Sequence, residues 1–392
     1  MPTGPGLDRP VLTGARRGGG WSRASGGAAL WARSDWGLVI AALGLSLVGA
    51  LLVWSATRQV AGSAYLVRHL FTTAVGVVIA ALVTRMGHQL LRAIAPLLYL
   101  LSVGGLLLVL TPVGSTVNGS HSWILLPGGF SVQPSEFAKA ALCLGLAIIL
   151  GERLDRGAAP NARDLALAVV VAAVPVGLVL LQPDLGSALV LGAMALGVVA
   201  VAGTPKRWLA LAAGLVAAAV VVALTTPVLS GYQRDRLTAF VDPDADPQGI
   251  GYQTRQVRIA IGSGGWQGQG LFEGRQTQGG FIPFQQTDFV FSVAGEELGF
   301  VGAAGLLVLL GFVVLRAVLV AARAQDAFGR LMAIGVATWL LFQVFENVGM
   351  NLGLTPVTGL PLPFLSYGGS SMFACWLAIG LVNNVHLSTY RA

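Results

Sequence analysis

The run WGLVIAALGLSLVGALLVWSA, residues 36–56, decides the class of fold. It contains no charged side chain, and its length matches the ~20 apolar residues that a helix needs to cross a bilayer. It also lacks the alternation of apolar and polar residues that is typical of a membrane β-strand. The run therefore predicts a transmembrane helix.

The composition of the whole chain agrees with this prediction. Of the 392 residues, 55% are hydrophobic and only 10% are charged, whereas a soluble domain has about a quarter of its residues charged. The two cysteines, Cys143 and Cys375, both lie in apolar runs, so they indicate neither a disulfide framework nor a metal site. We therefore expect the chain to reside in lipid.

Further runs of this kind predict an all-α polytopic membrane protein with ten transmembrane helices. We expect residues 1–34, rich in Gly, Arg and Ser, to form a disordered basic cytoplasmic arm, and residues 35–392 to form a single transmembrane domain. The first span starts too late and is too long for a cleavable signal peptide. The expected spans are residues 36–56, 66–84, 92–111, 134–150, 165–181, 187–203, 208–226, 297–322, 328–351 and 367–387.

The positions of Lys and Arg predict the orientation of the chain. Most of the 24 Lys and Arg residues lie in the N-terminal arm or in connections on the same side of the expected spans. Cytoplasmic loops carry such an excess, so we predict that both termini are cytoplasmic. Segment 227–296, the one long connection, then forms a large extracytoplasmic loop between helices 7 and 8. Its Gly, Pro and Trp content indicates a folded cap with short helices.

This loop carries a cluster of arginines whose positive charge predicts an anionic partner. The guanidinium fork matches phosphate, which makes phosphate groups the expected ligand. Anchoring to lipid headgroups is the alternative. The arginines that we expect to bind substrate are Arg234, Arg236, Arg255 and Arg258.

The stretch GGFIPFQQTDFVFSVAGEELGF, residues 279–300, places carboxylates at the edge of the bilayer. Asp288 precedes an apolar run, and Glu296 and Glu297 follow within the same stretch. Charge is costly at this depth and marks functional positions. We therefore expect Asp288 to be functional, and Glu296 and Glu297 to serve as helix-start charges.

Glu136 and Lys139 form a second polar feature, in SVQPSEFAKAALCLGLAIIL at residues 131–150. Three residues apart, they share one face of the predicted helix, and Pro134 suits its first turn. Such a pair inside a membrane usually faces the interior of the bundle. The spacing fits a structural ion pair that joins helices and a pair that lines the substrate cavity equally well.

Two further motifs contain candidate substrate-binding residues. In LLQPDLGSALVL, residues 180–191, Asp184 either caps the following helix or contacts substrate. In GLTPVTGLPLPFLSYGGSS, residues 353–371, the prolines prevent a continuous helix, and Ser366 and Tyr367 open the last span. Irregular backbone at membrane depth is tolerated where it is buried in protein or lines a cavity, so we expect this segment to line the site.

Together these motifs resemble the shape, elongation, division and sporulation (SEDS) family of bacterial membrane proteins. The matching pieces occur in the family's order and extend from the first span to the last. The C-terminal motif, with the LTPVTGLP that precedes it, is closer to the elongation members (RodA) than to the division members (FtsW). The pieces are GSHSWILLPGGFSVQPSEFAK, QPDLGSA, YQRDRLTAFVDP, GIGYQ, IAIGSGGWQGQGL, TDFVFSVAGEELGFVG and LPFLSYGGSS.

The chain departs from the family pattern at two positions before Asp288. Where the family commonly has Glu and His, this sequence has Phe284 and Gln286. The resemblance therefore carries the catalytic role of Asp288 over to this chain, but it carries over no mechanism that needs that Glu or His.

The resemblance implies a peptidoglycan glycosyltransferase that polymerises lipid II into glycan strands at the outer face of the bacterial cytoplasmic membrane, for cell-wall elongation and rod shape. The reaction is an inverting glycosyl transfer from an undecaprenyl-pyrophosphate-linked glycan to the sugar hydroxyl of lipid II. The implied protein partner is a class B penicillin-binding protein, a transpeptidase that cross-links the glycan. Membrane lipids surround the protein, and we expect no nucleic-acid partner.

This chemistry gives the charged residues their expected roles. A hydroxyl is a weak nucleophile until a base takes its proton, and we expect Asp288 to be that base. The leaving pyrophosphate needs positive charge, which the loop arginines supply. A divalent cation, Mg²⁺ or Mn²⁺, could share this task, although the sequence shows no separate metal site. The other residues that we expect to bind substrate are Glu136, Lys139, Asp184, Ser366 and Tyr367.

Two other functions fit parts of this pattern. A transporter that flips the lipid-linked precursor across the membrane would also need buried charges, broken helices and outer arginines. A non-catalytic scaffold that recruits the cross-linking enzyme is the second alternative. The sequence contains no Walker or Rossmann motif, which argues against an ATP-driven pump and against a nucleotide-sugar donor.

Overall fold

The structure is a computed structural model. From Asp35 onward the chain forms one compact, mostly helical unit. The predicted basic arm lies outside the described part of the chain up to residue 32. The described residues are 33–117, 119–127, 130–212, 214, 231–242 and 249–390.

Seven of the described helices are long and apolar enough to cross a membrane, so the chain is a multi-pass membrane protein. Two more of the predicted spans contain α5 (Pro134–Asp155) and the shorter apolar α7 (Leu185–Val201). The predicted span 208–226 lies largely outside the described residues. The seven are α2 (Trp36–Ala61), α3 (Ala64–Arg85), α4 (His88–Val109), α6 (Ala162–Leu180), α13 (Gly299–Arg323), α14 (Ala327–Leu352) and α15 (Gly369–Ser388).

Side-chain caps fix where several of these helices begin. The Asp35 carboxylate accepts a hydrogen bond from the Leu38 backbone N–H at 3.1 Å, at the start of α2. A reciprocal capping box starts α6, in which the side chains of Asn161 and Asp164 each accept the other's backbone N–H at 2.9 Å. These bonds satisfy N–H groups that the first turn of a helix leaves without intrahelical partners.

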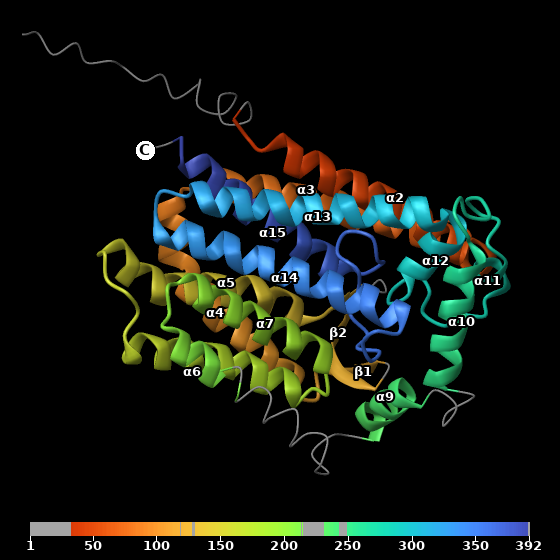
Figure 1. The fold of residues 1–392 in the computed structure, drawn as a ribbon, viewed down its shortest axis with the longest axis horizontal. Coiled ribbons are helices and arrows are strands. Elements are labelled where there is room, and N and C mark those ends of the chain that lie inside the picture. Colours follow the sequence, from red (N-terminus) through yellow and green to blue (C-terminus); the bar gives the residue numbers. More distant parts are fainter. Residues whose placement is uncertain are drawn as a thin grey trace, which may run out of the picture. The chain divides into compact units, whose positions relative to one another are not determined.

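Small residues bring two of the membrane helices into close contact. The long helix α3 packs along α15, while α5 packs against α4, α6, α7 and α14 (Figure 1). At the α3–α15 contact, Gly76 faces the ring of Trp376, and Gly380 faces the backbone of Ala80. Glycine at such positions lets helix backbones approach closely, which favours helix association in lipid.

A small β-sheet between α4 and α5 corrects the prediction of an all-α chain. The antiparallel strands β1 (Ser115–Val117), β2 (Ser120–Leu126) and β3 (Phe130–Val132) lie in that order. β1 and β3 have three residues each, which is too short for hydrophobic periodicity, and the seven residues of β2, SHSWILL, do not alternate between apolar and polar. The sheet ends directly before Gln133, at the start of α5, and so fixes one edge of the candidate site.

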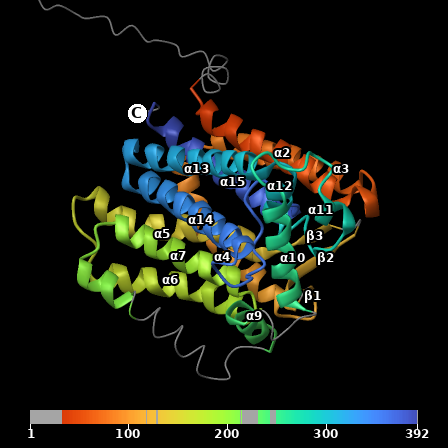
Figure 2. The same cartoon turned by 45° about the vertical axis from the view of Figure 1, so that its right-hand side comes forward.

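Four short helices precede α13 in the chain. They lie with the sheet at one end of the helix bundle, and the C-terminal end of α15 lies at the other (Figure 1 and Figure 2). Residues 227–230 and 243–248 of the predicted loop are outside the described part. The short helices are α9 (Gly231–Val241), α10 (Ile250–Ser263), α11 (Arg275–Gly279) and α12 (Val290–Glu297).

A glycine-rich loop closes the break between α12 and α13. Leu298 separates the two helices, and Gly299, with a φ of +66°, is the first residue of α13. The N–H of Gln269 donates to the Glu296 carbonyl at 2.9 Å. The N–H of Phe300, on the far side of the break, donates to the Gly265 carbonyl at 2.9 Å. Backbone groups that the break would leave without partners are therefore satisfied within the protein.

Glu296 and Glu297 lie at the end of α12, so the prediction that they are start charges of their own spanning helix is wrong. Glu296 is fully buried. Its carboxylate accepts the N–H of Gln276 at 2.7 Å and the N–H of Thr277 at 2.9 Å, which caps the start of α11. Glu297 accepts the hydroxyl of Ser55, on α2, at 2.5 Å. Both carboxylates thus connect the loop to the bundle.

Replacing Gly299 with alanine should lower the melting temperature of the detergent-solubilised protein. A Cβ atom there would lie 2.7 Å from the carbonyl carbon of Gln267. An L-residue in a left-handed conformation also costs roughly 1–2 kcal/mol before any clash. Gly305→Ala, in the same helix, is the matched control because nothing lies within 4 Å of its added methyl group. Equal stability of the two variants would contradict the role given to Gly299.

Candidate functional site

Asp288 follows a tight turn between α11 and α12 that has an unusual backbone conformation. The Asp288 N–H donates to the carbonyl of Phe284 at 3.1 Å, and Phe284 has a φ of +57°. This left-handed conformation costs a residue with a side chain roughly 1–2 kcal/mol. Such strain persists only where surrounding contacts hold the backbone. Here those contacts come from α14 and from the segment after it.

A polar stripe on α14, formed by Gln343, Asn347 and Asn351, makes the first set of contacts. The three residues are spaced four apart, so they share one face of the helix. Nδ2 of Asn347 donates to the carbonyls of Asp288 at 2.9 Å and Leu360 at 2.7 Å. Nδ2 of Asn351 donates to the same Asp288 carbonyl at 3.2 Å. The stripe thus joins the Asp288 turn to the irregular segment that follows α14.

This stripe is not among the residues predicted from the sequence. Its signal is present there, because amide side chains at four-residue spacing lie in a mostly apolar span, the last two of them on either side of the turn that follows Glu346. Polar side chains at such positions face the interior of a membrane bundle and tend to be functional. These amide side chains carry no charge, however, so the search for isolated charges in apolar runs does not select them.

Ser366 and Tyr367 support the same turn from the segment after α14. Oγ of Ser366 donates to the Thr287 carbonyl at 2.5 Å and accepts the N–H of Leu362 at 2.8 Å. The backbone N–H of Tyr367 donates to the carbonyl of Gln286 at 2.9 Å. Both residues therefore position the turn. A contact of either with substrate stays a prediction.

Asp288 and Arg236 converge on the space beside Gly359. A Cβ atom at Gly359 would lie 3.5 Å from Oδ2 of Asp288 and 3.3 Å from Nη2 of Arg236. Gly359 has a φ of +73°, a conformation that also favours glycine. The arginine comes from α9 and the glycine from the segment after α14. A carboxylate and a guanidinium therefore face one small space, which the missing side chain of Gly359 keeps open.

Burial raises the pKa of the Asp288 carboxyl to about 6. The positive charge of Arg236 and a hydrogen bond from the Thr287 side chain lower this pKa, and the negative charge of Asp184 raises it. The effect of burial is the largest, because a charged carboxylate loses its hydration there. The group therefore exchanges its proton close to neutral pH, which suits a general base.

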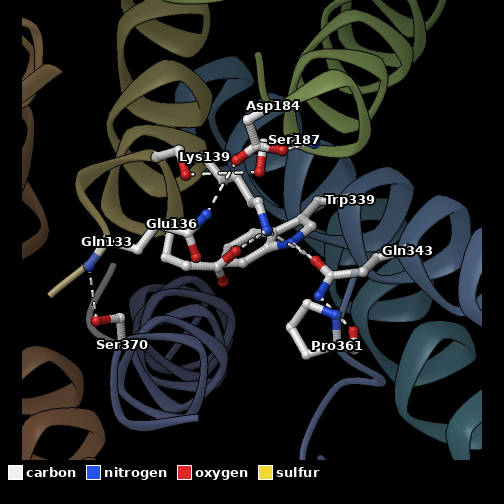
Figure 3. Close-up of polar contacts among 10 residues, drawn as sticks. Gln133, Glu136, Lys139, Asp184, Ser187, Trp339, Gln343, Pro361 and Ser370 are labelled. Carbon is white, nitrogen blue, oxygen red and sulfur yellow. Dashed lines mark hydrogen bonds and ion pairs between the residues drawn. The ribbon is translucent and has the colours of Figure 1, made fainter. Parts of the chain in front are cut away.

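Asp184 caps α7 and also lies close enough to affect the charge of the catalytic candidate. Oδ1 of Asp184 accepts the N–H of Ser187 at 3.0 Å, and Oδ2 accepts Nε2 of Gln133 at 2.9 Å (Figure 3). Of the two predicted roles of Asp184, the capping of the following helix is therefore observed. A contact of Asp184 with substrate stays a prediction.

The other predicted loop arginines lie elsewhere on the short helices. Arg255 and Arg258 are exposed on α10. The Arg258 guanidinium lies beside Gly353, at the C-terminal end of α14. The side chain of Arg234, on α9, lies outside the described residues. Binding of phosphate by these three arginines stays a prediction.

Glu136 and Lys139 form a fully buried ion pair at the start of α5 (Figure 3). Nζ of Lys139 lies 2.5 Å from Oε1 of Glu136 and donates to Oε1 of Gln343 at 3.0 Å. The same Gln343 oxygen accepts the indole N–H of Trp339 at 2.7 Å, and Nε2 of Gln343 donates to the Pro361 carbonyl at 2.8 Å. The pair is therefore connected through the polar stripe to the segment that carries Gly359.

A metal ion has few candidate ligands in the part of the chain that the structure describes. No three His, Cys, Asp or Glu side chains in that part are grouped so that they could hold an ion. The nearby carboxylates of Asp184 and Asp288 are the type of ligand that Mg²⁺ prefers, and Mg²⁺ is often bound by one or two carboxylates together with substrate phosphates. A cation shared with substrate stays a prediction.

Comparison with known proteins gives the family. The model of the FtsW/RodA/SpoVE cell cycle proteins matches residues 35–391. A probable peptidoglycan glycosyltransferase FtsW of Trichlorobacter lovleyi is 40% identical over 361 residues, which cover 90% of this chain and 93% of the relative. The peptidoglycan glycosyltransferase MrdB of Escherichia coli K12 is 37% identical over 349 residues, which cover 89% and 92% of the two chains.

Solved structures agree with these relatives. A chain from a peptidoglycan synthase complex, studied for its coordination of polymerization and crosslinking, matches with a TM-score of 0.77 and 37% identity over 92% of this chain and 99% of the other. The rod shape determining protein RodA of Thermus thermophilus matches with a TM-score of 0.68 and 35% identity over 92% and 98% of the two chains. The chain therefore belongs to the FtsW/RodA/SpoVE family, the SEDS family that its motifs resemble.

Proposed function

We propose that this protein is a peptidoglycan glycosyltransferase that polymerises lipid II into glycan strands. The observation that carries the proposal is the convergence of Asp288 and Arg236 beside Gly359, in a chain of this family. The activity for which the FtsW and MrdB relatives are named supports the reaction class. The segment 354–369, LTPVTGLPLPFLSYGG, is closer to the elongation members of the family and so supports a role in cell-wall elongation and rod shape. The identities of 40% to an FtsW relative and 37% to MrdB do not bear on this role.

In the proposed reaction, the sugar hydroxyl of one lipid II molecule attacks the anomeric carbon of a glycan attached to undecaprenyl pyrophosphate. Asp288 accepts the hydroxyl proton as the new C–O bond forms. The bond from the anomeric carbon to the pyrophosphate oxygen breaks on the opposite face, which inverts the anomeric configuration. Arg236 stabilises the negative charge that develops on the leaving pyrophosphate. The reaction therefore needs the carboxylate and the guanidinium at one small space.

A divalent cation, Mg²⁺ or Mn²⁺, is a further proposed participant. Asp184 would hold it together with oxygens of the pyrophosphate, and it would add positive charge for the leaving group there. The negative charge of Asp184, which lies close enough to raise the pKa of Asp288, supports this arrangement, because two carboxylates close to each other attract a cation.

The proposed surroundings are the bacterial cytoplasmic membrane, with both termini in the cytoplasm and α9 to α12 outside. The excess of Lys and Arg in the N-terminal arm and in the connections at the other end of the bundle supports this orientation. The proposed partner is a class B penicillin-binding protein. The likeness to a chain from a peptidoglycan synthase complex supports that partner.

Labelling of single cysteines with a membrane-impermeant maleimide on intact cells checks the orientation. In a background with Cys143 and Cys375 replaced by alanine, Gln267→Cys should react, because Gln267 is exposed beside α10. Ala159→Cys is the matched control, exposed in the turn between α5 and α6, and should react only after the membrane is opened. The reverse pattern would invert the proposed topology.

The pH dependence of kcat/KM for glycan synthesis tests Asp288 as the base. Only the deprotonated carboxylate accepts a proton, so the rate should rise with pH and level off above about 6, where the pKa of Asp288 lies. Arg236→Gln removes a charge that favours the carboxylate, so its rise should move to higher pH. Purified protein and lipid II in detergent provide the measurement.

The matched control for this pH profile is Asp288→Asn, which keeps the shape of the side chain but cannot accept a proton. It should abolish glycan synthesis and leave expression and melting temperature unchanged. Glycan synthesis by this variant near the wild-type rate would exclude Asp288 as the base. Absence of any product from the wild-type protein would instead favour the flippase or the scaffold.

Melting temperature and glycan yield together separate the two interpretations of Glu136 and Lys139. Lys139→Met should lower the melting temperature, because removal of one partner of a buried ion pair typically costs about 3–5 kcal/mol. The double variant Glu136→Gln with Lys139→Met should recover stability but not glycan yield, since Gln343 loses its charged donor next to the segment of Gly359. Recovery of the yield would give the pair a purely structural role.

A further inference from the structure

We propose that Phe284 binds substrate, with its aromatic ring as a platform for the sugar that accepts the glycan; this inference rests on the proposed function. The ring is exposed and belongs to the turn that presents Asp288. The proposed reaction gives a role to Asp288 and to Arg236 but none to this ring. Phe284 also replaces the Glu that is common in the family, so the ring is a feature of this chain rather than of the family pattern.

The backbone of Phe284 belongs to the turn that holds Asp288. Its carbonyl accepts the N–H groups of Thr287 and Asp288, both at 3.1 Å, and the hydroxyl of Thr287 at 3.2 Å. The bond from Asp288 spans four residues, so the two residues lie one helical turn apart. The ring is therefore attached to the backbone next to the proposed base.

The side chain of Phe284 faces outward, whereas its apolar neighbours in the chain face inward. Ile282 and Phe289 belong to a small buried core that also contains residues of α10 and α14. The side chain of Gln285 is buried as well, and its amide donates to the carbonyl of Ala56 at 2.7 Å. The Phe284 ring, in contrast, is 40% exposed. It is therefore accessible to a ligand.

The backbone conformation of Phe284 is unfavourable for a residue with a side chain. A φ of +57° costs such a residue roughly 1–2 kcal/mol, whereas glycine adopts it readily. Glycine would thus form the turn at a lower cost. The exposed apolar ring adds a further cost in water. Strain of this kind clusters at functional sites, and here it indicates that the ring itself has a partner.

A sugar ring is the partner whose chemistry fits this position. One face of a pyranose carries mainly C–H groups, which pack on an aromatic ring while the hydroxyls at the rim keep their hydrogen bonds to water. Burial of this apolar face is favourable. A base must lie about 2.6–3.2 Å from the hydroxyl that it deprotonates, so the sugar that Asp288 activates lies within reach of residue 284, one turn away. The occupant is therefore the acceptor sugar.

Steady-state kinetics of glycan synthesis from lipid II test this platform. Phe284→Leu keeps an apolar side chain but removes the flat ring, so KM should rise by about tenfold while kcat changes little. The conservative variant Phe284→Tyr keeps the ring and should restore KM. Phe281→Leu is the matched control, since Phe281 is 49% exposed and its ring lies beside Gly279 of α11. This control should behave as wild type.

A lipid headgroup is the alternative partner of an aromatic ring at the membrane surface. Phe281 and Phe284 would then contribute alike, and Phe281→Leu would raise KM as much as Phe284→Leu does. That result, or an unchanged KM in Phe284→Leu, would overturn the inference. Phe284→Met removes the same flat ring and serves if the leucine variant does not fold.

The variant Phe284→Glu tests where the side chain lies. A glutamate beside Asp288 adds a negative charge, which raises the pKa of the Asp288 carboxyl as Asp184 already does. Only the deprotonated carboxylate accepts a proton, so the rise of kcat/KM should move to higher pH. KM should rise as in Phe284→Leu, because a carboxylate offers no flat apolar face. An unshifted pH profile, or a KM equal to that of the wild type, would contradict the placement of the ring.

Saturation-transfer NMR tests the platform without catalysis. The ligand is the soluble disaccharide of lipid II without its polyprenyl pyrophosphate, and the protein carries Asp288→Asn. Saturation of the protein's aromatic protons should transfer to the C–H protons of the sugar, and the transfer should fall in Phe284→Leu but not in Phe281→Leu. Equal transfer in these two variants would overturn the inference. Transfer in the expected pattern, in a protein whose wild-type form makes no glycan, would retain the platform and contradict the proposed function alone.

Discussion

The need to satisfy backbone carbonyls inside a bilayer is the constraint on which the rest of this structure depends. Lipid offers no hydrogen-bond donors, so irregular backbone within the bundle must receive them from the protein. The polar stripe of α14 supplies these donors to the carbonyls of Asp288, Leu360 and Pro361. Two non-helical segments can therefore meet inside a helical membrane protein. A strained turn can also present a carboxylate where they meet.

The chemistry of the site follows from opposing electrostatic effects at this meeting point. Burial raises the pKa of Asp288, and the negative charge of Asp184 adds to that effect. The positive charge of Arg236 opposes both, and the resulting pKa is about 6. The same guanidinium faces the space beside Gly359, together with the Asp288 carboxylate. Any side chain larger than that of glycine would enter this space.

The length of the apolar runs and the isolated charges are the sequence features that predicted this structure well. The long apolar runs place the helices, and the isolated charges identify Asp288 and the Glu136–Lys139 pair. The parts that the sequence does not reveal depend on backbone partners. Asn347 donates to carbonyls far along the chain, and Glu296 caps a helix that starts about 20 residues before it. A side chain that bonds to backbone has no complementary residue type to pair with in a sequence. The short β-sheet is not predicted for a related reason. Main-chain bonds hold its strands together, and their sequences show no alternation of apolar and polar residues.

The polar stripe also sets the order in which the site can be assembled during synthesis. The Asp288 turn precedes α13 in the chain, but the donors that hold it lie on α14, and Ser366 follows later still. A growing chain therefore contains the carboxylate and one earlier support, the bond from Gln285 to the Ala56 carbonyl at 2.7 Å, before it contains the donors of α14. The turn has all of these supports only after α14 and the segment up to Ser366 have been made. A chain that ends before Ser366 therefore lacks part of the contacts that hold the turn before Asp288.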